Sequence, residues 1–148
     1  DVAPIHNNYP FPAYQNSQIA QLSIAGEFPV QHQDDGKYWI AATHFLRSCT
    51  KMFYGNTSNK GAPPPIVKLN GYGDFVLKNI PCVVESMTTE LPNNVDYIRC
   101  PVPTGGNQWV PTDSTISVIL KPIYSRSKVE QFSLDNFVNG GLIDQGYI

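Results

Sequence analysis

The stretch that decides the fold is DGKYWIAATHFLRSCTKMFYG, residues 35–55, the one segment of this chain with clear helical periodicity. Its apolar residues recur at spacings of three and four, as on the buried side of a helix. Asp34 and Asp35 offer capping oxygens and negative charge at its start, and Gly55 suits the left-handed residue that closes a helix. The sequence predicts one helix over residues 35–54.

The apolar surface of this helix is wider than one stripe against a sheet requires. Its first row consists of Tyr38, Ala42, Phe45, Cys49 and Met52. A neighbouring row consists of Trp39, Leu46 and Phe53. A helix seated deeply on a sheet explains both rows, and so does a helix with one row on its own sheet and the other on a second subunit. We expect Phe45 in the core and place the row of Trp39, Leu46 and Phe53 at a subunit interface.

On both sides of the helix the chain consists of short β-type runs separated by turns. Period-two alternation, the pattern of a half-buried strand, is cleanest in STISVILKP, where Ile116, Val118 and Leu120 point inward and Pro122 ends the run. Gly71 and Gly73 mark a tight turn rather than a phosphate loop, which needs a lysine and a helix start. We expect strands over residues 18–28, 67–69, 83–91, 95–100 and 114–122.

These elements predict a mainly β fold with one core: an antiparallel β-sandwich or open barrel with one flanking α-helix. The prolines and asparagines of residues 1–17 predict an extended N-terminal arm before a domain of residues 18–128. Residues 129–148 are too apolar for a solvated terminus and predict a docking segment. Its interface candidates are Phe132, Leu134, Phe137 and Leu142.

Composition limits the function. Charged residues make up 15% of the 148 residues and the net charge is −2, so direct nucleic-acid recognition, which needs a clustered basic face, is excluded as the main role. No apolar run approaches the roughly 20 residues that span a bilayer. The first residues, DVAPIHNNYPFP, show neither an initiator Met nor a signal peptide, as expected of a fragment or a processed product.

The sequence shows no set of residues for catalysis, a cofactor or a metal. Cys49, Cys82 and Cys100 lack metal-ligand spacing and are interpreted as buried thiols of a reducing compartment, with a Cys82–Cys100 disulfide left open. His32 with Asp34 and Asp35 forms the best polar cluster, but carboxylates at a helix start are expected as caps. His44 is interpreted as a packed or hydrogen-bonded histidine. We therefore expect no enzyme, no cofactor and no metal.

Five segments in order carry a resemblance to a known family. They are GEFPVQHQDDGKYWIAATHFLRSCTKMFYG, PPPIVKLNGYGD, IPCVVESMTTELPNNVDYI, VPTDSTISVILKPIYSR and FSLDNFVNGGLI. This order resembles the small tail-tube-like proteins found in the baseplate or at the tube end of contractile-tailed bacteriophages. It covers about residues 18–143 and is most specific in the helix and in LPNNVDYI.

The resemblance implies a tail-tube fold assembled as a homo-oligomer, a hexameric ring whose inner sheets line a channel that DNA crosses as transient cargo. Other tube or baseplate proteins are then partners, and the virion, built in the bacterial cytoplasm, is the location. Two other interpretations stay open. A non-catalytic β-sandwich binding module of a secreted or surface protein predicts a monomer with paired cysteines, and a small hydrolase predicts a cleft with perturbed titratable groups.

Overall fold

The strands and helices are described in a computed structural model that covers residues 8–9, 12–55 and 58–148. The strands are β1 Leu22–Glu27, β2 Val67–Gly71, β3 Leu77–Glu90, β4 Tyr97–Val102, β5 Gly106–Pro111 and β6 Thr115–Pro122. The helices are α1 Gln33–Cys49, α2 Arg126–Glu130 and α3 Leu134–Val138. The predicted mainly β fold with one main helix is confirmed.

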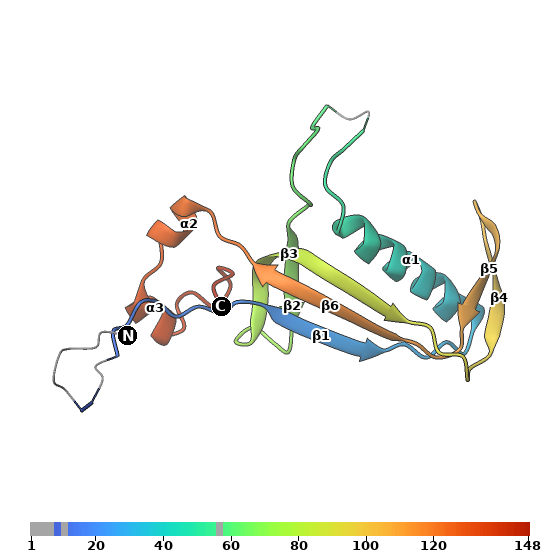
Figure 1. Ribbon diagram of the computed structural model, residues 1–148, viewed down its shortest axis with the longest axis horizontal. Coiled ribbons are helices and arrows are strands. Elements are labelled where there is room, and N and C mark those ends of the chain that lie inside the picture. Colours follow the sequence, from blue (N-terminus) through green and yellow to red (C-terminus); the bar gives the residue numbers. More distant parts are fainter. Residues whose placement is uncertain (1–7, 10–11, 56–57) are drawn as a thin grey trace.

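Four strands form a curled antiparallel sheet in the order β1-β6-β3-β2, and β4 and β5 form a separate two-stranded sheet (Figure 1). The register places Leu22 beside Leu120 and Ile24 beside Val118, so the apolar residues of neighbouring strands share one face. Ile116, Val118 and Leu120 are buried, as their alternation predicted. This face of the sheet is the floor of the main core.

Helix α1 lies across that apolar face and holds the small sheet at its N-terminal end (Figure 1). Cys49, Trp39 and Leu46 pack into the main core with Ile80, Cys82 and Val84 of β3. A second cluster of Val30, Cys100 and Val110 fills the space between the start of the helix and the β4–β5 sheet. Two-stranded sheets are marginal alone, so this second cluster is what fixes β4 and β5.

The helix is shorter than the sequence predicted. It ends at Cys49, with Thr50 as its C-cap, and not at residue 54. The Ser48 hydroxyl donates to the carbonyl of His44 at 2.8 Å and the Thr50 hydroxyl donates to that of Arg47 at 2.7 Å. Such side-chain bonds satisfy the last carbonyls and compete with continuation of the helix. Gly55 does have the expected positive φ, 81°, but in the loop beyond.

The two apolar rows of the helix also differ from expectation. Phe45, expected in the core, is 60% exposed, and Tyr38 of the same row is 66% exposed. Trp39 and Leu46 of the other row face the sheet instead. The residues that point most directly inward are small: Gly36, Thr43 and Cys49 are the buried positions. Small residues bring the helix close to the sheet, so the larger side chains lie at its flanks.

Three strand predictions need correction. β3 begins at Leu77 rather than Val83 and contains Pro81, whose carbonyl accepts a hydrogen bond from the amide of Ile123 at 2.9 Å. Because a strand residue presents its N and C=O to the same side, the missing N–H of Pro81 faces Ile123, one residue past the end of β6, so the proline falls at the last step of this ladder. Strand β5 falls in a segment expected to be a loop, and β4 runs two residues past Cys100.

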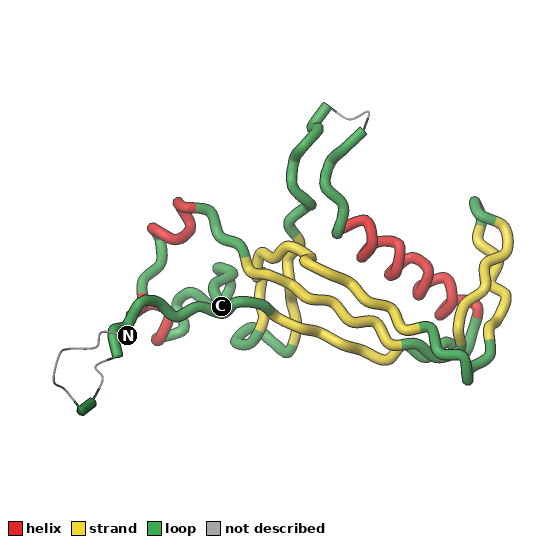
Figure 2. Tube along the Cα trace, viewed as in Figure 1, coloured by secondary structure: helices red, strands yellow, loops and turns green. Residues whose placement is uncertain are grey.

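The N-terminal part of the described chain extends away from the sheet, and the C-terminus lies beside the same end of the sheet (Figure 2). Residues 12–21 form neither helix nor strand and are exposed, while part of the predicted arm, residues 1–7 and 10–11, lies outside the described residues. After β6 the chain forms α2 and α3 and then returns to the sheet, where Ile148 packs against the main core. A loop after α1 projects from the body between α1 and β2 (Figure 1).

Candidate assembly surfaces

The polar cluster at the start of α1 is a helix cap. His32 is the N-cap, and Asp35 accepts hydrogen bonds from the backbone amides of His32 at 3.1 Å and Gln31 at 3.2 Å. Asp34 pairs with Lys37 at 3.1 Å. Asp35 therefore satisfies free backbone N–H groups, and both carboxylates complement the positive end of the helix dipole, as the sequence suggested.

The cysteines are free and buried, and they lie in two different clusters, Cys49 and Cys82 in the main core and Cys100 under the β4–β5 sheet. Burial raises the pKa of the Cys49 and Cys82 thiols, which disfavours the reactive thiolate. His44 is exposed on α1. Among residues 8–9, 12–55 and 58–148, no group of three or more His, Cys, Asp or Glu is placed to hold a metal ion.

The interface candidates of the helix occupy three different environments. The indole N–H of Trp39 donates to the hydroxyl of buried Ser114 at 2.8 Å, and the ring contacts both hydrophobic clusters. Leu46 packs against the main core. Phe53 lies in the projecting loop, 41% exposed, with its amide hydrogen-bonded to the carbonyl of Ala62 at 3.0 Å. Of the three, Phe53 is the one that the fold leaves most available to another molecule.

The exposed flank of α1 carries aromatic residues that sequence reasoning assigned to the core. Tyr38 stacks on Phe28, with ring centroids 5.7 Å apart, and Phe45 borders an apolar groove between α1 and the sheet. That groove has a volume of about 230 Å³, and Ile24, Val67 and Leu69 lie along it. The two apolar rows in the sequence indicated that α1 has apolar surface beyond what one sheet covers. Which row faces the sheet was predicted wrongly, because the small buried residues Gly36, Thr43 and Cys49 were not taken into account.

The C-terminal candidates are only partly covered by their own chain. Phe132 contacts Phe137 and Tyr147, with centroids 5.7 and 5.3 Å apart. Leu142 is half-buried, whereas Leu134 is 65% exposed. The hydroxyl of Tyr147 donates to the carbonyl of Lys128 at 2.6 Å, which ties the last residues to α2. This segment folds back on its own sheet through its end and leaves one side of α3 open.

The sheet ends in two open edges within the described residues. β1 pairs only with β6 and β2 pairs only with β3, so the outer backbone groups of both edge strands have no strand partner there. All of β1 after Leu22 is exposed, including the side chain of Ile24. An open edge with exposed apolar residues is a template for pairing with another chain.

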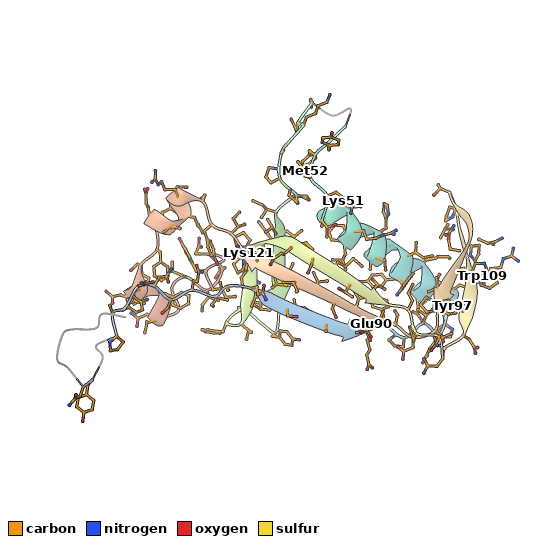
Figure 3. All side chains as sticks on the ribbon, in the orientation of Figure 1. Lys51, Met52, Glu90, Tyr97, Trp109 and Lys121 are labelled. Atoms are coloured by element: carbon orange, nitrogen blue, oxygen red, sulfur yellow. The ribbon has the colours of Figure 1, made fainter. Side chains whose placement is uncertain are left out.

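The face of the sheet opposite α1 is mostly polar. The register and the burial pattern place on it the residues that alternate with the core positions. They include Ser23 and Ala25 on β1, Thr115 and Ser117 on β6, and Ser86 and Thr88 on β3, with Val83 and Ile119 as larger aliphatic members. The register places the charged residues Glu27, Glu90, Lys68 and Lys121 on this face, and exposed Glu85 lies at the bulge between Val84 and Ser86. Figure 3 shows Glu90 and Lys121 at opposite ends of the sheet.

A hollow of about 360 Å³ lies between α1, the end of β3 and strand β5. We call it the α1–β5 hollow, and it is lined by Trp39, Ile40, Thr43, His44, Arg47, Thr89, Leu91, Gln108 and Trp109. Trp109 is 67% exposed. Sequence reasoning missed Trp109 because strand β5 itself was not recognised.

Comparison with known proteins returned no relatives: no family model, no curated protein and no solved structure matches this chain. In the part of the chain that the structure describes, no helix combines the length and the apolar character that crossing a bilayer requires.

Proposed function

We propose that this chain is a virion structural protein that forms a ring, with six copies as the expected number, in the tail tube or at the junction of baseplate and tube of a contractile-tailed bacteriophage. The sequence resemblance motivates this proposal. The observation that carries it is the curled four-stranded sheet, open at both edges and backed by one helix.

The strand directions allow the sheets of neighbouring copies to join with the same antiparallel pairing that each sheet has internally. All neighbouring strands are antiparallel, and the sheet has an even number of strands. β2 of one copy therefore runs antiparallel to β1 of the next when their sheets are placed in series. The two edge strands have similar lengths, six and five residues. Closure of such a series into a ring removes every open edge.

The polar face supports a channel through that ring. Curling the sheets into a barrel with the helices outside turns the face opposite α1 toward the lumen. That face combines serine, threonine and aliphatic residues with glutamates at one end and two lysines, Lys68 and Lys121, at the other, so it offers phosphates only two basic groups. A channel for DNA requires a surface of this kind, because tight binding would hold the cargo in place.

Sedimentation and electron microscopy of the purified chain test the proposal. We expect a species of about six times the 16.4 kDa chain mass, seen as rings or as stacked rings. A chain that stays monomeric alone and is also absent from tube segments rebuilt with its neighbouring tail proteins would contradict it. The alternative, a non-catalytic binding module of a secreted or surface protein, predicts that monomer.

A further inference from the structure

The α1–β5 hollow has an apolar floor and a basic rim. Ile40 and Leu91 supply aliphatic surface and Trp109 forms an exposed aromatic wall. Arg47 and His44 stand on the helix at the border, and no carboxylate in the described residues lies within ion-pair distance of either side chain. Such a site fits an apolar segment that carries negative charge.

One polar group of the hollow lacks a partner. The hydroxyl of Thr43, which also lines the hollow, is buried without a hydrogen-bond partner in the described part of the chain. A buried hydroxyl of this kind usually finds a partner in the functional state of a protein. The hollow is therefore equipped with a polar group as well as with charge for a bound segment.

The C-terminal segment of this same chain has the matching chemistry. Residues 129–148 contain three acidic residues and no lysine, arginine or histidine. On α3, Leu134 and Val138 are 65% and 75% exposed, and a spacing of four puts them on one side of the helix. Asp135 lies beside them, while Phe137 faces Phe132 on the segment's own side. The exposed side of α3 is thus an apolar pair with an adjacent carboxylate.

The two surfaces lie at opposite ends of the molecule. Figure 1 shows α3 beyond one end of the sheet and β5 beyond the other, with the full length of the strands between them. Tyr147 and Ile148 hold the C-terminal segment at its own end through contacts with Tyr124 and the main core. The segment of one copy therefore cannot reach the hollow of that copy.

We propose that the α1–β5 hollow binds α3 of a second copy of this chain, with Leu134 and Val138 against Ile40 and Trp109 and with Asp135 facing Arg47. We choose this binding partner because Arg47 has no ion pair among the described residues and the C-terminal segment is acidic, so the two surfaces have complementary charge. Since the surface on one copy differs from the surface on its partner, the contact is head-to-tail and generates rings or filaments, not two-fold dimers. It rests on the self-association in the proposed function and not on the virion role.

Exchanging the two charges provides the test. Arg47→Glu damages the hollow and leaves α3 intact, whereas Asp135→Arg does the reverse. Each variant alone should raise the dissociation constant for self-association by roughly threefold to thirtyfold, the effect of losing an attraction and adding a repulsion of similar size. Sedimentation velocity over a range of protein concentrations measures it. Lys51→Glu makes the same change of charge just beyond α1 and outside the hollow, so it should leave association unchanged.

A mixture of the two variants tests directly whether Arg47 and residue 135 of different copies meet. In a head-to-tail contact, the glutamate introduced into the hollow of one variant meets the arginine introduced into α3 of the other. The Arg47 that the second variant retains then meets the Asp135 that the first retains. An equimolar mixture of the two variants should therefore associate again, as should the double variant Arg47→Glu/Asp135→Arg. Far-ultraviolet circular dichroism verifies that every variant is folded.

Three results would overturn the proposal: a wild-type chain that stays monomeric at its highest soluble concentration, an unchanged dissociation constant for Arg47→Glu, or a mixture that fails to recover. Rings that form equally well from Arg47→Glu would reject this contact and leave the proposed function standing. Head-to-tail assembly that depends on the charge pair, in a protein found absent from tail tubes, would support this contact and reject the proposed virion function.

Discussion

At Gly36 the contact between α1 and β4 leaves no room for a side chain. A Cβ built there collides with Sγ of Cys100, whose side chain is fully buried. An alanine inside a helix usually stabilises by about 1 kcal/mol over glycine, but forcing an extra methyl group into a packed core costs about 1–3 kcal/mol. The clash therefore outweighs the gain in helix propensity.

We predict that Gly36→Ala lowers the free energy of unfolding by up to about 2 kcal/mol, measured by urea denaturation. Cys100→Ala removes the colliding sulfur. The double variant Gly36→Ala/Cys100→Ala should accordingly lose less stability than the sum of the two single variants, since a shared contact makes the effects non-additive. Strictly additive losses would show that the two residues do not compete for this space.

Phe45 and Ile80 form a second contrast between single residues. Ile80 is 1% exposed in the main core, and Ile80→Ala should cost about 2–5 kcal/mol. Phe45 is 60% exposed, so Phe45→Ala should cost about 1 kcal/mol or less. Thermal and urea unfolding of the two variants under one condition measure both values. If Phe45→Ala lowers the free energy of unfolding as much as Ile80→Ala does, Phe45 is a core residue in solution.

Among the secondary-structure elements, the sequence predicted those whose buried side consists of large apolar residues. β6 was correct to the residue at Pro122 because Ile116, Val118 and Leu120 alternate strictly. β5 was missed because its buried positions, Val110 and Pro111, come at its end after Gly106 and polar residues, which gives no alternation. Its pairing depends on contacts with α1 that are distant in sequence.

The end of α1 was mispredicted for a local reason. Apolar residues continue past Cys49 through Met52 and Phe53, so periodicity alone extends the helix. The hydrogen bonds of Ser48 and Thr50 to carbonyls of the last turn end it instead. The candidate assembly surfaces were predictable in part. The excess of apolar residues indicated that α1 has more apolar surface than its own sheet covers, but which side chains stay exposed depended on the small residues that face the sheet.

The C-terminal element is held by Tyr147, by Ile148 in the main core and by side-chain hydrogen bonds from Asn79 and Tyr124 to the carbonyls of Asp144 and Gly146. Tyr147 stacks with Tyr124 at 5.9 Å, contacts Phe132, accepts Lys128 over its ring at 4.8 Å and bonds the carbonyl of Lys128. A segment with so few anchors opens locally at a lower free energy than the sheet.

Tyr147→Ala should therefore release residues 129–148 without unfolding the sheet. We expect limited proteolysis to cleave this segment several times faster, while the melting transition of the sheet changes little. Val129→Ala is the matched control, because Val129 lies in the same segment, is 60% exposed and makes no comparable anchor. Equal cleavage rates for Tyr147→Ala and wild type would show that other contacts hold the segment.

On the scale of the whole molecule, the sheet has an apolar face under α1 and a polar face open to solvent, with exposed apolar groups along its flank and at both ends. Side chains such as Tyr72, Phe75 and Trp109 are more than half exposed. A monomer of this size gains nothing from this distribution, because contiguous exposed apolar surface favours association. The proposed assembly would cover these aromatic residues and would account for the low charge content of the chain.

The polar face leads to a prediction about DNA. Glu27 and Glu90 both lie beside Thr115, so the two carboxylates are neighbours at one end of this face. If the face lines a channel, the assembled wild-type protein should bind duplex DNA weakly even at low salt. Glu27→Lys/Glu90→Lys should bind it more tightly, and each new phosphate contact should steepen the salt dependence of log K by about 0.9. Fluorescence anisotropy in a salt series measures this slope.

The predicted increase in DNA binding depends on where the new positive charges lie and not on how many there are. Glu130→Lys/Asp144→Lys makes the same charge change outside the sheet, in the C-terminal segment, and should have the smaller effect. Equal slopes for the two double variants would mean that DNA responds only to net charge and does not enter the space before the polar face. Tight, salt-sensitive binding by the wild type would exclude a passive channel and assign the chain to DNA binding instead.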